Sequence, residues 1–189
     1  MTGDPTFFPD AADFRRWLTS TDATELWIGF FKKGSGKSGL TYAEAVDEAL
    51  CFGWIDGQKQ AHDSVSYKLR FTPRKVNSVW SKVNVGNAER LINEDRMTPA
   101  GLAAITAAKA NGRWEAAYEG SRAITVPPDL QAWLDAHLEP ARFFASISAA
   151  NRYAFLYRLA TAVKPATRTK RFEAIVGMLT AKQVFHPTG

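Results

Sequence analysis

The chain has 189 residues, of which 46% are apolar and 23% are charged, close to the average of folded soluble proteins. This composition excludes a disordered tail, a collagen-like repeat and a disulfide-stapled miniprotein, and no apolar stretch is long enough to cross a bilayer. Cys51 is the single cysteine and cannot form an internal disulfide. The N-terminal segment has neither the basic region nor the long apolar region of a secretory signal. We therefore expect a cytoplasmic globular protein.

Positive charge is concentrated in two windows of the sequence. The formal net charge is +5, yet residues 65–88 hold five basic and no acidic side chains, and residues 140–172 hold seven basic and no acidic ones. The remaining segments are acidic or balanced. Acid-free windows favour an anionic partner, and a solvated basic face is the alternative that needs no partner.

The first third of the chain predicts two helices separated by a strand. Asp10 is suited to cap the first helix, and the aromatic run 25–31 predicts a buried strand. Residues 34–39 are rich in glycine and serine and predict a flexible loop. A capping box at 41–44 begins the second helix, and Gly53 ends it.

The next segment predicts the rest of a small sheet. Residues 54–58 predict a strand or a turn, with Asp56-Gly57 typical of a turn. Residues 66–71 alternate with period two, which places Tyr67, Leu69 and Phe71 on one face and Lys68 and Arg70 on the other. Pro73 ends this strand. The pattern favours an antiparallel sheet with one or two helices on one face.

The chain beyond Trp80 predicts only helices. One helix covers about 84–94, a second begins at the Thr98-Pro99 cap and ends at Asn111-Gly112, and Ser148 is suited to cap a later one. Pro127-Pro128 is the best candidate linker. The sequence therefore predicts an α+β fold, with a domain over 1–126 that contains the sheet and an all-helical module over 127–189.

Common catalytic and metal-binding motifs are incomplete. Gly36-Lys37-Ser38 lies between a strand and a helix, but the first glycine of a P-loop is replaced by Phe31. Cys51 lies near the C-terminal end of its helix, where the helix dipole disfavours a thiolate, so a buried structural thiol is favoured over a nucleophile paired with His62. No Cys, His or carboxylate cluster has metal-ligand spacing, and no cofactor fingerprint is present. We predict no catalytic residue, no metal and no cofactor.

The first basic window interleaves cations with aromatic residues. This composition is typical of a surface that binds nucleotides or single-stranded nucleic acid by charge and stacking. The alternative is that the aromatic residues are core and the cations lie on a solvated sheet face. The candidate cations are Lys68, Arg70, Arg74, Lys75 and Lys82, and the candidate stacking residues are Trp54, Tyr67 and Trp80.

The second basic window begins the last predicted helix. Arg168, Lys170 and Arg171 fall in or near its first turns, where cations oppose the helix dipole at a cost of about 0.3–1 kcal/mol each. Helix N-terminal amides and arginine side chains together suit a phosphate, a carboxylate ligand or an acidic neighbour. Intramolecular pairing with an acidic residue elsewhere in the chain is the alternative.

Several longer motifs resemble the bacteriocin-protection, YdeI/OmpD-associated family. They are the run Leu26–Lys33, the segments Ala49–Gly57 and Arg70–Lys75, and the C-terminal Ala162-x-Lys-Pro-x-Thr-Arg-x-Lys-Arg171. The resemblance covers about residues 26–180. It implies a small bacterial protein and supplies no catalytic residues.

We therefore predict a cytoplasmic stress-resistance or bacteriocin-protection protein that acts by binding an anionic small molecule or an acidic protein surface. Two alternatives stay open. A nucleic-acid-binding protein predicts affinity that falls steeply with salt. An enzyme for a small phosphorylated or carboxylated substrate predicts Asp56 or Cys51 in a closed pocket beside the arginines.

Overall fold

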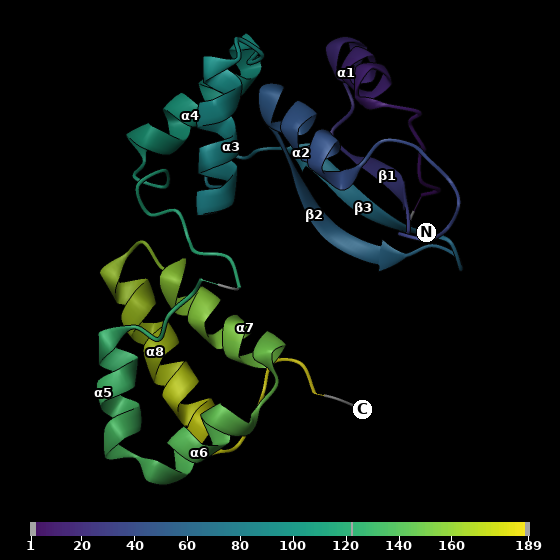
Figure 1. Cartoon of the computed structure of the whole chain (residues 1–189). Helices are drawn as coiled ribbons and strands as arrows, with labels where there is room; N and C mark the ends of the chain where they lie inside the picture. The colour runs from purple at the N-terminus through teal and green to yellow at the C-terminus, as the bar shows by residue number, and fades with distance from the viewer. Residues whose placement is uncertain (1–2, 122, 188–189) are drawn as a thin grey trace. The chain divides into compact units, whose positions relative to one another are not determined.

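The computed structural model describes residues 3–121 and 123–187, and the chain divides into two compact units (Figure 1). The first unit comprises Met1–Ser78 and Asn84–Asn111, and the second comprises Val79–Val83 and Gly112–Gly189. Of the described residues, three strands and several helices lie in the first half, and the C-terminal part contains helices only. The predicted α+β class is confirmed. Within these residues, no helix has both the length and the apolar character needed to span a bilayer.

The first unit is built on a three-stranded antiparallel sheet with the order β1-β3-β2. Its strands are β1 (Leu26–Phe31), β2 (Trp54–Ala61) and β3 (Ser66–Pro73). Helices α1 (Ala11–Ser20) and α2 (Tyr42–Cys51) cover one face, where Leu69 and Phe71 of the central strand are buried as the alternation predicts (Figure 1).

The other face of the sheet is partly covered by the N-terminal segment. Thr6 extends the sheet at the edge of β1, because its N–H donates to Trp27 O at 2.8 Å and its carbonyl accepts from Gly29 N at 2.9 Å. Lys68 is buried beneath this segment, with its Nζ 3.0 Å from Gly3 O and 4.9 Å from the centre of the Trp27 ring. The alternative that places Lys68 on a solvated sheet face is therefore wrong, and its buried amine, proposed to bind a ligand, contacts its own chain.

The predicted helix starts are confirmed at four positions. The side chains of Asp10, Thr98 and Ser148 each accept a hydrogen bond from the main-chain N–H three residues later. Thr41 and Glu44 form the predicted capping box. These signals are local in sequence, which is why they can be recognised without knowledge of the tertiary structure.

Of the two alternatives for residues 54–58, the strand is confirmed and the turn at Asp56-Gly57 is not, because both residues lie inside β2. The pairing of β2 with β3 shifts register between Asp56 and Lys59, which marks a β-bulge. Glycine inside a strand is typical of such bulges. The Asp56 side chain accepts a hydrogen bond from the Tyr42 hydroxyl at 2.9 Å, so it ties β2 to the start of α2.

Two further helices complete the first half of the chain, α3 (Lys82–Asn93) and α4 (Pro99–Ala110). The start of α4 is joined to the end of α2, because Thr98 N and Thr98 Oγ1 donate to Cys51 O at 3.0 and 2.7 Å. The backbone passes close by at this point, since a Cβ on Gly101 would lie 2.3 Å from the same carbonyl oxygen.

Among the described residues from 123 onward, the second unit contains the helices α5 (Pro128–Ala136), α6 (Leu138–Ser146), α7 (Ala149–Ala160) and α8 (Pro165–Thr180). Their apolar faces form one core that includes Leu130, Phe155, Ile175 and Leu179. The segment before α3 belongs to this unit, where Trp80 is buried with its ring 4.9 Å from that of Trp114.

Candidate functional site

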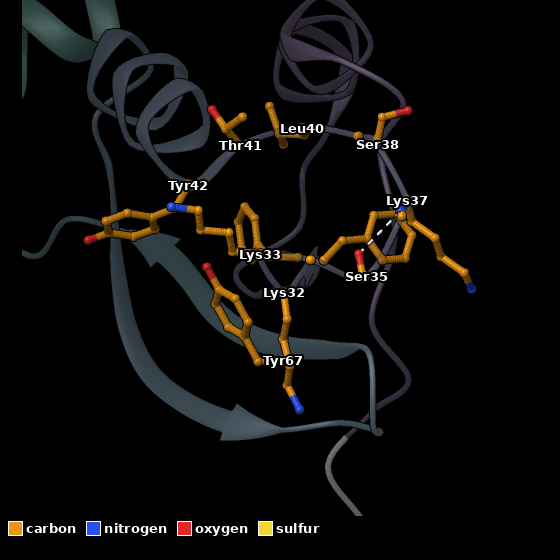
Figure 2. A pocket seen from close by; sticks show the side chains of 14 residues that line it. Lys32, Lys33, Ser35, Lys37, Ser38, Leu40, Thr41, Tyr42 and Tyr67 are labelled. Atoms are coloured by element: carbon orange, nitrogen blue, oxygen red, sulfur yellow. Dashed lines mark hydrogen bonds between the residues drawn. The ribbon is translucent and has the colours of Figure 1, made fainter.

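A cavity of about 410 Å³ opens in the first unit between the end of β1 and the start of α2. The loop that joins these elements forms most of its wall, and Tyr67 reaches it from β3 (Figure 2). This volume lies within the range of about 300–1,000 Å³ that is typical of small-molecule sites. Its lining residues are Phe30, Phe31, Lys32, Lys33, Gly34, Ser35, Gly36, Lys37, Ser38, Gly39, Leu40, Thr41, Tyr42 and Tyr67.

The sequence of the loop explains its shape. Gly34 and Gly36 have φ values of 84° and 71°, in the left-handed region that glycine adopts at little cost. Ser35 N donates to Lys32 O at 3.1 Å, and Lys37 N donates to the Ser35 hydroxyl at 3.2 Å. The loop predicted to be flexible therefore has a defined turn structure of its own.

The N-terminal segment braces this loop from both sides. The Phe7 ring stacks on Phe31 with 5.0 Å between centroids and 21° between planes. Leu40 N donates to Phe8 O at 3.0 Å. The two ends of the loop are thus tied to one neighbouring segment, which holds the cavity open between them.

Three lysines line the cavity, but only one extends across it. Lys32 Nζ donates to two carbonyl oxygens of the β2–β3 turn at 2.9 and 3.2 Å, and Lys37 Nζ lies 5.4 Å from the centre of the Phe31 ring. In Figure 2 both of these side chains point away from the cavity, whereas Lys33 crosses it toward Tyr42. Among the residues that the structure describes, the Lys33 amine has no hydrogen-bond partner and the lining contains no carboxylate. The cavity therefore presents positive charge without an internal counter-ion.

Tyr67 adds a hydroxyl group to the same space. Its ring is held by stacking on Phe30, with 5.5 Å between centroids, and by Lys59 Nζ, 4.1 Å from its centre. Burial raises the pKa of Tyr67 above its ordinary value, so the hydroxyl stays protonated at neutral pH. In Figure 2 this hydroxyl points toward the Lys33 side chain. An anion in the cavity could accept a hydrogen bond from it.

The start of α2 is closed to a phosphate by its own capping box. Glu44 Oε2 accepts from Thr41 N at 2.9 Å and from Thr41 Oγ1 at 2.7 Å. These hydrogen bonds, the main-chain one first, lower the pKa of Glu44, which therefore keeps its negative charge beside the helix N-terminus. A P-loop requires that position for a phosphate, so Gly36-Lys37-Ser38 does not form one here.

The predicted residues of the first basic window are dispersed. Arg70 pairs with Glu25 on the surface, and Lys75 is exposed at the end of the sheet. Trp54 is buried in the core of the first unit, and Trp80 is buried in the second unit. Of the predicted ligand-binding residues, Tyr67 alone appears in the described lining of the cavity.

The other cations of that window contact their own chain. Arg74 N donates to Gly53 O at 2.8 Å, and its side-chain Nε and Nη2 atoms are buried. Lys82 Nζ lies 2.5 Å from Glu119 Oε1 in the second unit.

The predicted cations of the second basic window lie on α8, and two of them contact their own chain. Arg168 forms a two-point ion pair with Asp129 of α5, with Arg168 Nη2 3.0 Å from Asp129 Oδ1. Arg171 Nη1 donates to Arg158 O at 2.7 Å. Lys170 is exposed. For Arg168, these contacts correspond to the alternative of intramolecular pairing.

The Arg168–Asp129 pair predicts a specific pH dependence. The hydrogen bond from Arg168 is the main reason that the pKa of Asp129 is lowered from its usual value of 3.8. The pair therefore stabilises the folded second unit fully above that value, and the contribution is lost as the pH falls through the lower folded pKa. We expect Asp129→Asn to lower the urea midpoint at neutral pH and to have a smaller effect as the pH falls below 3.8, measured by circular dichroism. A loss that stays the same as the pH falls would contradict the pairing.

The residues proposed for an enzyme lie outside the cavity. Cys51 is fully buried, and burial is the main cause that raises its pKa, so the thiol is held protonated. Asp56 is engaged by the Tyr42 hydroxyl, as described above. Within residues 3–121 and 123–187, no group of three His, Cys, Asp or Glu side chains is arranged to hold a metal ion.

Sequence reasoning missed Lys33 and Tyr42, the two lining residues that give the cavity its charge and its outer wall. A usable signal was present, because residues 26–43 contain three lysines and no acidic residue. Tyr42 follows the glycine loop directly, and Phe30 and Phe31 precede it. Glu25 and Glu44 flank this stretch, so its positive charge is cancelled when a longer segment is considered.

Comparison with known families divides the chain in two. The model of a domain of unknown function (DUF8412) matches residues 6–104. The model of the family described as bacteriocin-protection, YdeI or OmpD-associated matches residues 123–182. No curated protein and no solved structure matches the chain. The resemblance predicted from sequence is thus confirmed for the C-terminal part, whereas its N-terminal motifs fall in the other match. The chain belongs to the DUF8412 family, and its residues 123–182 are similar to the bacteriocin-protection, YdeI or OmpD-associated family.

Proposed function

We propose that this protein binds a small anionic molecule in the cavity beside the glycine-rich loop. The observation that carries the proposal is the Lys33 amine, which extends into a cavity lined by lysines and by no carboxylate among the described residues. A protective role against a bacteriocin or another stress enters the proposal through the C-terminal family match alone.

The neighbouring groups support an anion rather than a cation or a neutral ligand. The Tyr67 hydroxyl is a donor on the wall of the cavity, and Gly34, Gly36 and Gly39 of the loop line it without adding an acceptor side chain. Lys32 and Lys37 add positive potential nearby, although their amines contact other groups. An ammonium group without a carboxylate partner, next to a hydroxyl donor, is the usual chemistry of carboxylate and phosphate sites.

The proposal is tested by titrating the full chain with inorganic pyrophosphate and following main-chain amide signals by NMR. We expect shifts at Gly34 and Gly36, and we expect Lys33→Ala to weaken binding about tenfold, because a charge-assisted hydrogen bond contributes about 1.5–3 kcal/mol. Affinity should fall as salt is added, since the site is open to solvent.

Two further variants decide where the anion binds. Lys182 lies in the second unit, where its Nζ is 3.9 Å from Glu139 Oε2. Lys182→Ala removes the same charge as Lys33→Ala and should leave the affinity unchanged. Lys75→Ala tests the first basic window directly. If Lys75→Ala weakens binding and Lys33→Ala does not, the cavity is not the site.

A further inference from the structure

The aromatic rings of the cavity differ in how much of their surface is available to a ligand. Phe30 is buried, with 2% of its surface exposed, and it covers one side of Tyr67 while Lys59 Nζ lies over that ring. Phe31 is contacted by the Phe7 ring and by Lys37 Nζ. These rings therefore form the structural wall of the cavity and leave little ring surface for stacking.

Tyr42 differs from them because 45% of its surface is exposed. Its hydroxyl donates to Asp56 Oδ2 at 2.9 Å, and its ring meets Phe30 edge-on with 6.3 Å between centroids. The ring is thus fixed at its outer end and at its inner edge. In Figure 2 it forms one side of the cavity, on the side toward which Lys33 extends.

We propose that the ligand is an aromatic anion, whose planar ring lies along Tyr42 and whose phosphate or carboxylate group meets the Lys33 amine. This inference rests on the proposed function and narrows its ligand class. A ring that is already oriented loses little conformational freedom when a ligand stacks on it, which favours planar ligands over flexible ones. The cavity volume of about 410 Å³ leaves room for a ring and a charged group together.

The described lining of the cavity presents donors, and not the Asp56 carboxylate, to the charged end of the ligand. The Tyr42 hydroxyl already satisfies that carboxylate, and Asp56 is absent from the described lining of the cavity. An anionic group placed at Lys33 and the Tyr67 hydroxyl therefore meets two donors.

The test compares four probes by calorimetric titration of the full chain: phenyl phosphate, cyclohexyl phosphate, inorganic phosphate and benzoate. We expect phenyl phosphate to bind about tenfold more tightly than cyclohexyl phosphate, because stacking on an aromatic side chain contributes about 1–3 kcal/mol. Benzoate reports whether a carboxylate serves as well as a phosphate. Tighter binding of benzoate than of phenyl phosphate would assign the carboxylate as the preferred group.

Two variants of one residue separate the ring from its hydroxyl. Tyr42→Leu should remove the preference for phenyl over cyclohexyl phosphate, and Tyr42→Phe should retain most of it. If both phosphate esters bind equally to the native protein and both depend on Lys33, the aromatic specificity is wrong and the anion site stands. If none of the four probes binds, the proposed function itself is overturned.

Discussion

Gly101→Ala is expected to destabilise the first unit by about 2–3 kcal/mol, the upper range for overpacking of a close contact. The added Cβ would lie 2.3 Å from Cys51 O and 2.8 Å from Cys51 C. Both are main-chain atoms, which cannot turn aside as a flexible side chain can. The same carbonyl accepts hydrogen bonds from Thr98 N and Thr98 Oγ1, so moving it would also loosen the start of α4.

Gly86→Ala is the matched control, because it makes the same chemical change inside α3. No described heavy atom lies within 4 Å of the Cβ that it would add. Alanine is favoured over glycine in a helix by about 1 kcal/mol, so this variant should be slightly more stable than the native protein. Urea unfolding of both variants gives the comparison. Equal stability of the two variants would show that α2 and α4 do not approach each other as closely as described.

The features that sequence predicted correctly are those with local causes. The capping box at Thr41 and the alternation around Leu69 depend on spacing within a few residues, and both are confirmed. Helix ends such as Asn111-Gly112 follow from one residue's backbone preference, since Gly112 has a φ of 72°. None of these features requires knowledge of what packs against them.

The features that sequence could not supply depend on contacts between distant segments. Lys68 is buried because residues 3–8 run beside the sheet, and nothing in the alternation around Lys68 reveals that segment. Arg168 pairs with Asp129, which lies 39 residues earlier in the sequence. The residues close to Arg168 in the sequence contain no acidic side chain before Glu173, so the partner could not be identified from them. The cavity itself arises from a loop, a helix start and a β3 side chain that meet only after folding.

The buried carboxylate of α2 belongs to the same class of non-local feature. The helical wheel places Glu48 away from the apolar stripe of α2, yet only 5% of its side chain is exposed. Glu48 Oε2 lies 2.7 Å from Arg15 Nη1, and Glu48 Oε1 lies 2.6 Å from Arg96 Nη2. Arg15 comes from α1 and Arg96 precedes α4, so one carboxylate joins three segments of the first unit. Without these two arginines its burial would be strongly unfavourable.

Glu48→Gln is therefore expected to destabilise the first unit by about 2–3 kcal/mol. The substitution keeps the shape of the side chain and removes its charge, which leaves two guanidinium groups near a neutral amide. Breaking a fully buried pair costs about 3–5 kcal/mol. The two arginine side chains remain 37% and 35% exposed, so water compensates part of this loss.

The control for Glu48→Gln is Glu25→Gln, which removes the same charge from a surface pair. Glu25 and Arg70 are 43% and 44% exposed, and exposed pairs contribute about 0–1 kcal/mol. The measurement is the hydrogen-exchange rate of the main-chain amides of α2 and β3 in the full chain, which reports the stability of the first unit in each variant. Faster exchange only in Glu48→Gln would establish that the carboxylate holds α1, α2 and the segment before α4 together. Equal exchange rates in the two variants would mean that the ion pairs of Glu48 with Arg15 and Arg96 do not stabilise the first unit. Packing alone would then join these segments.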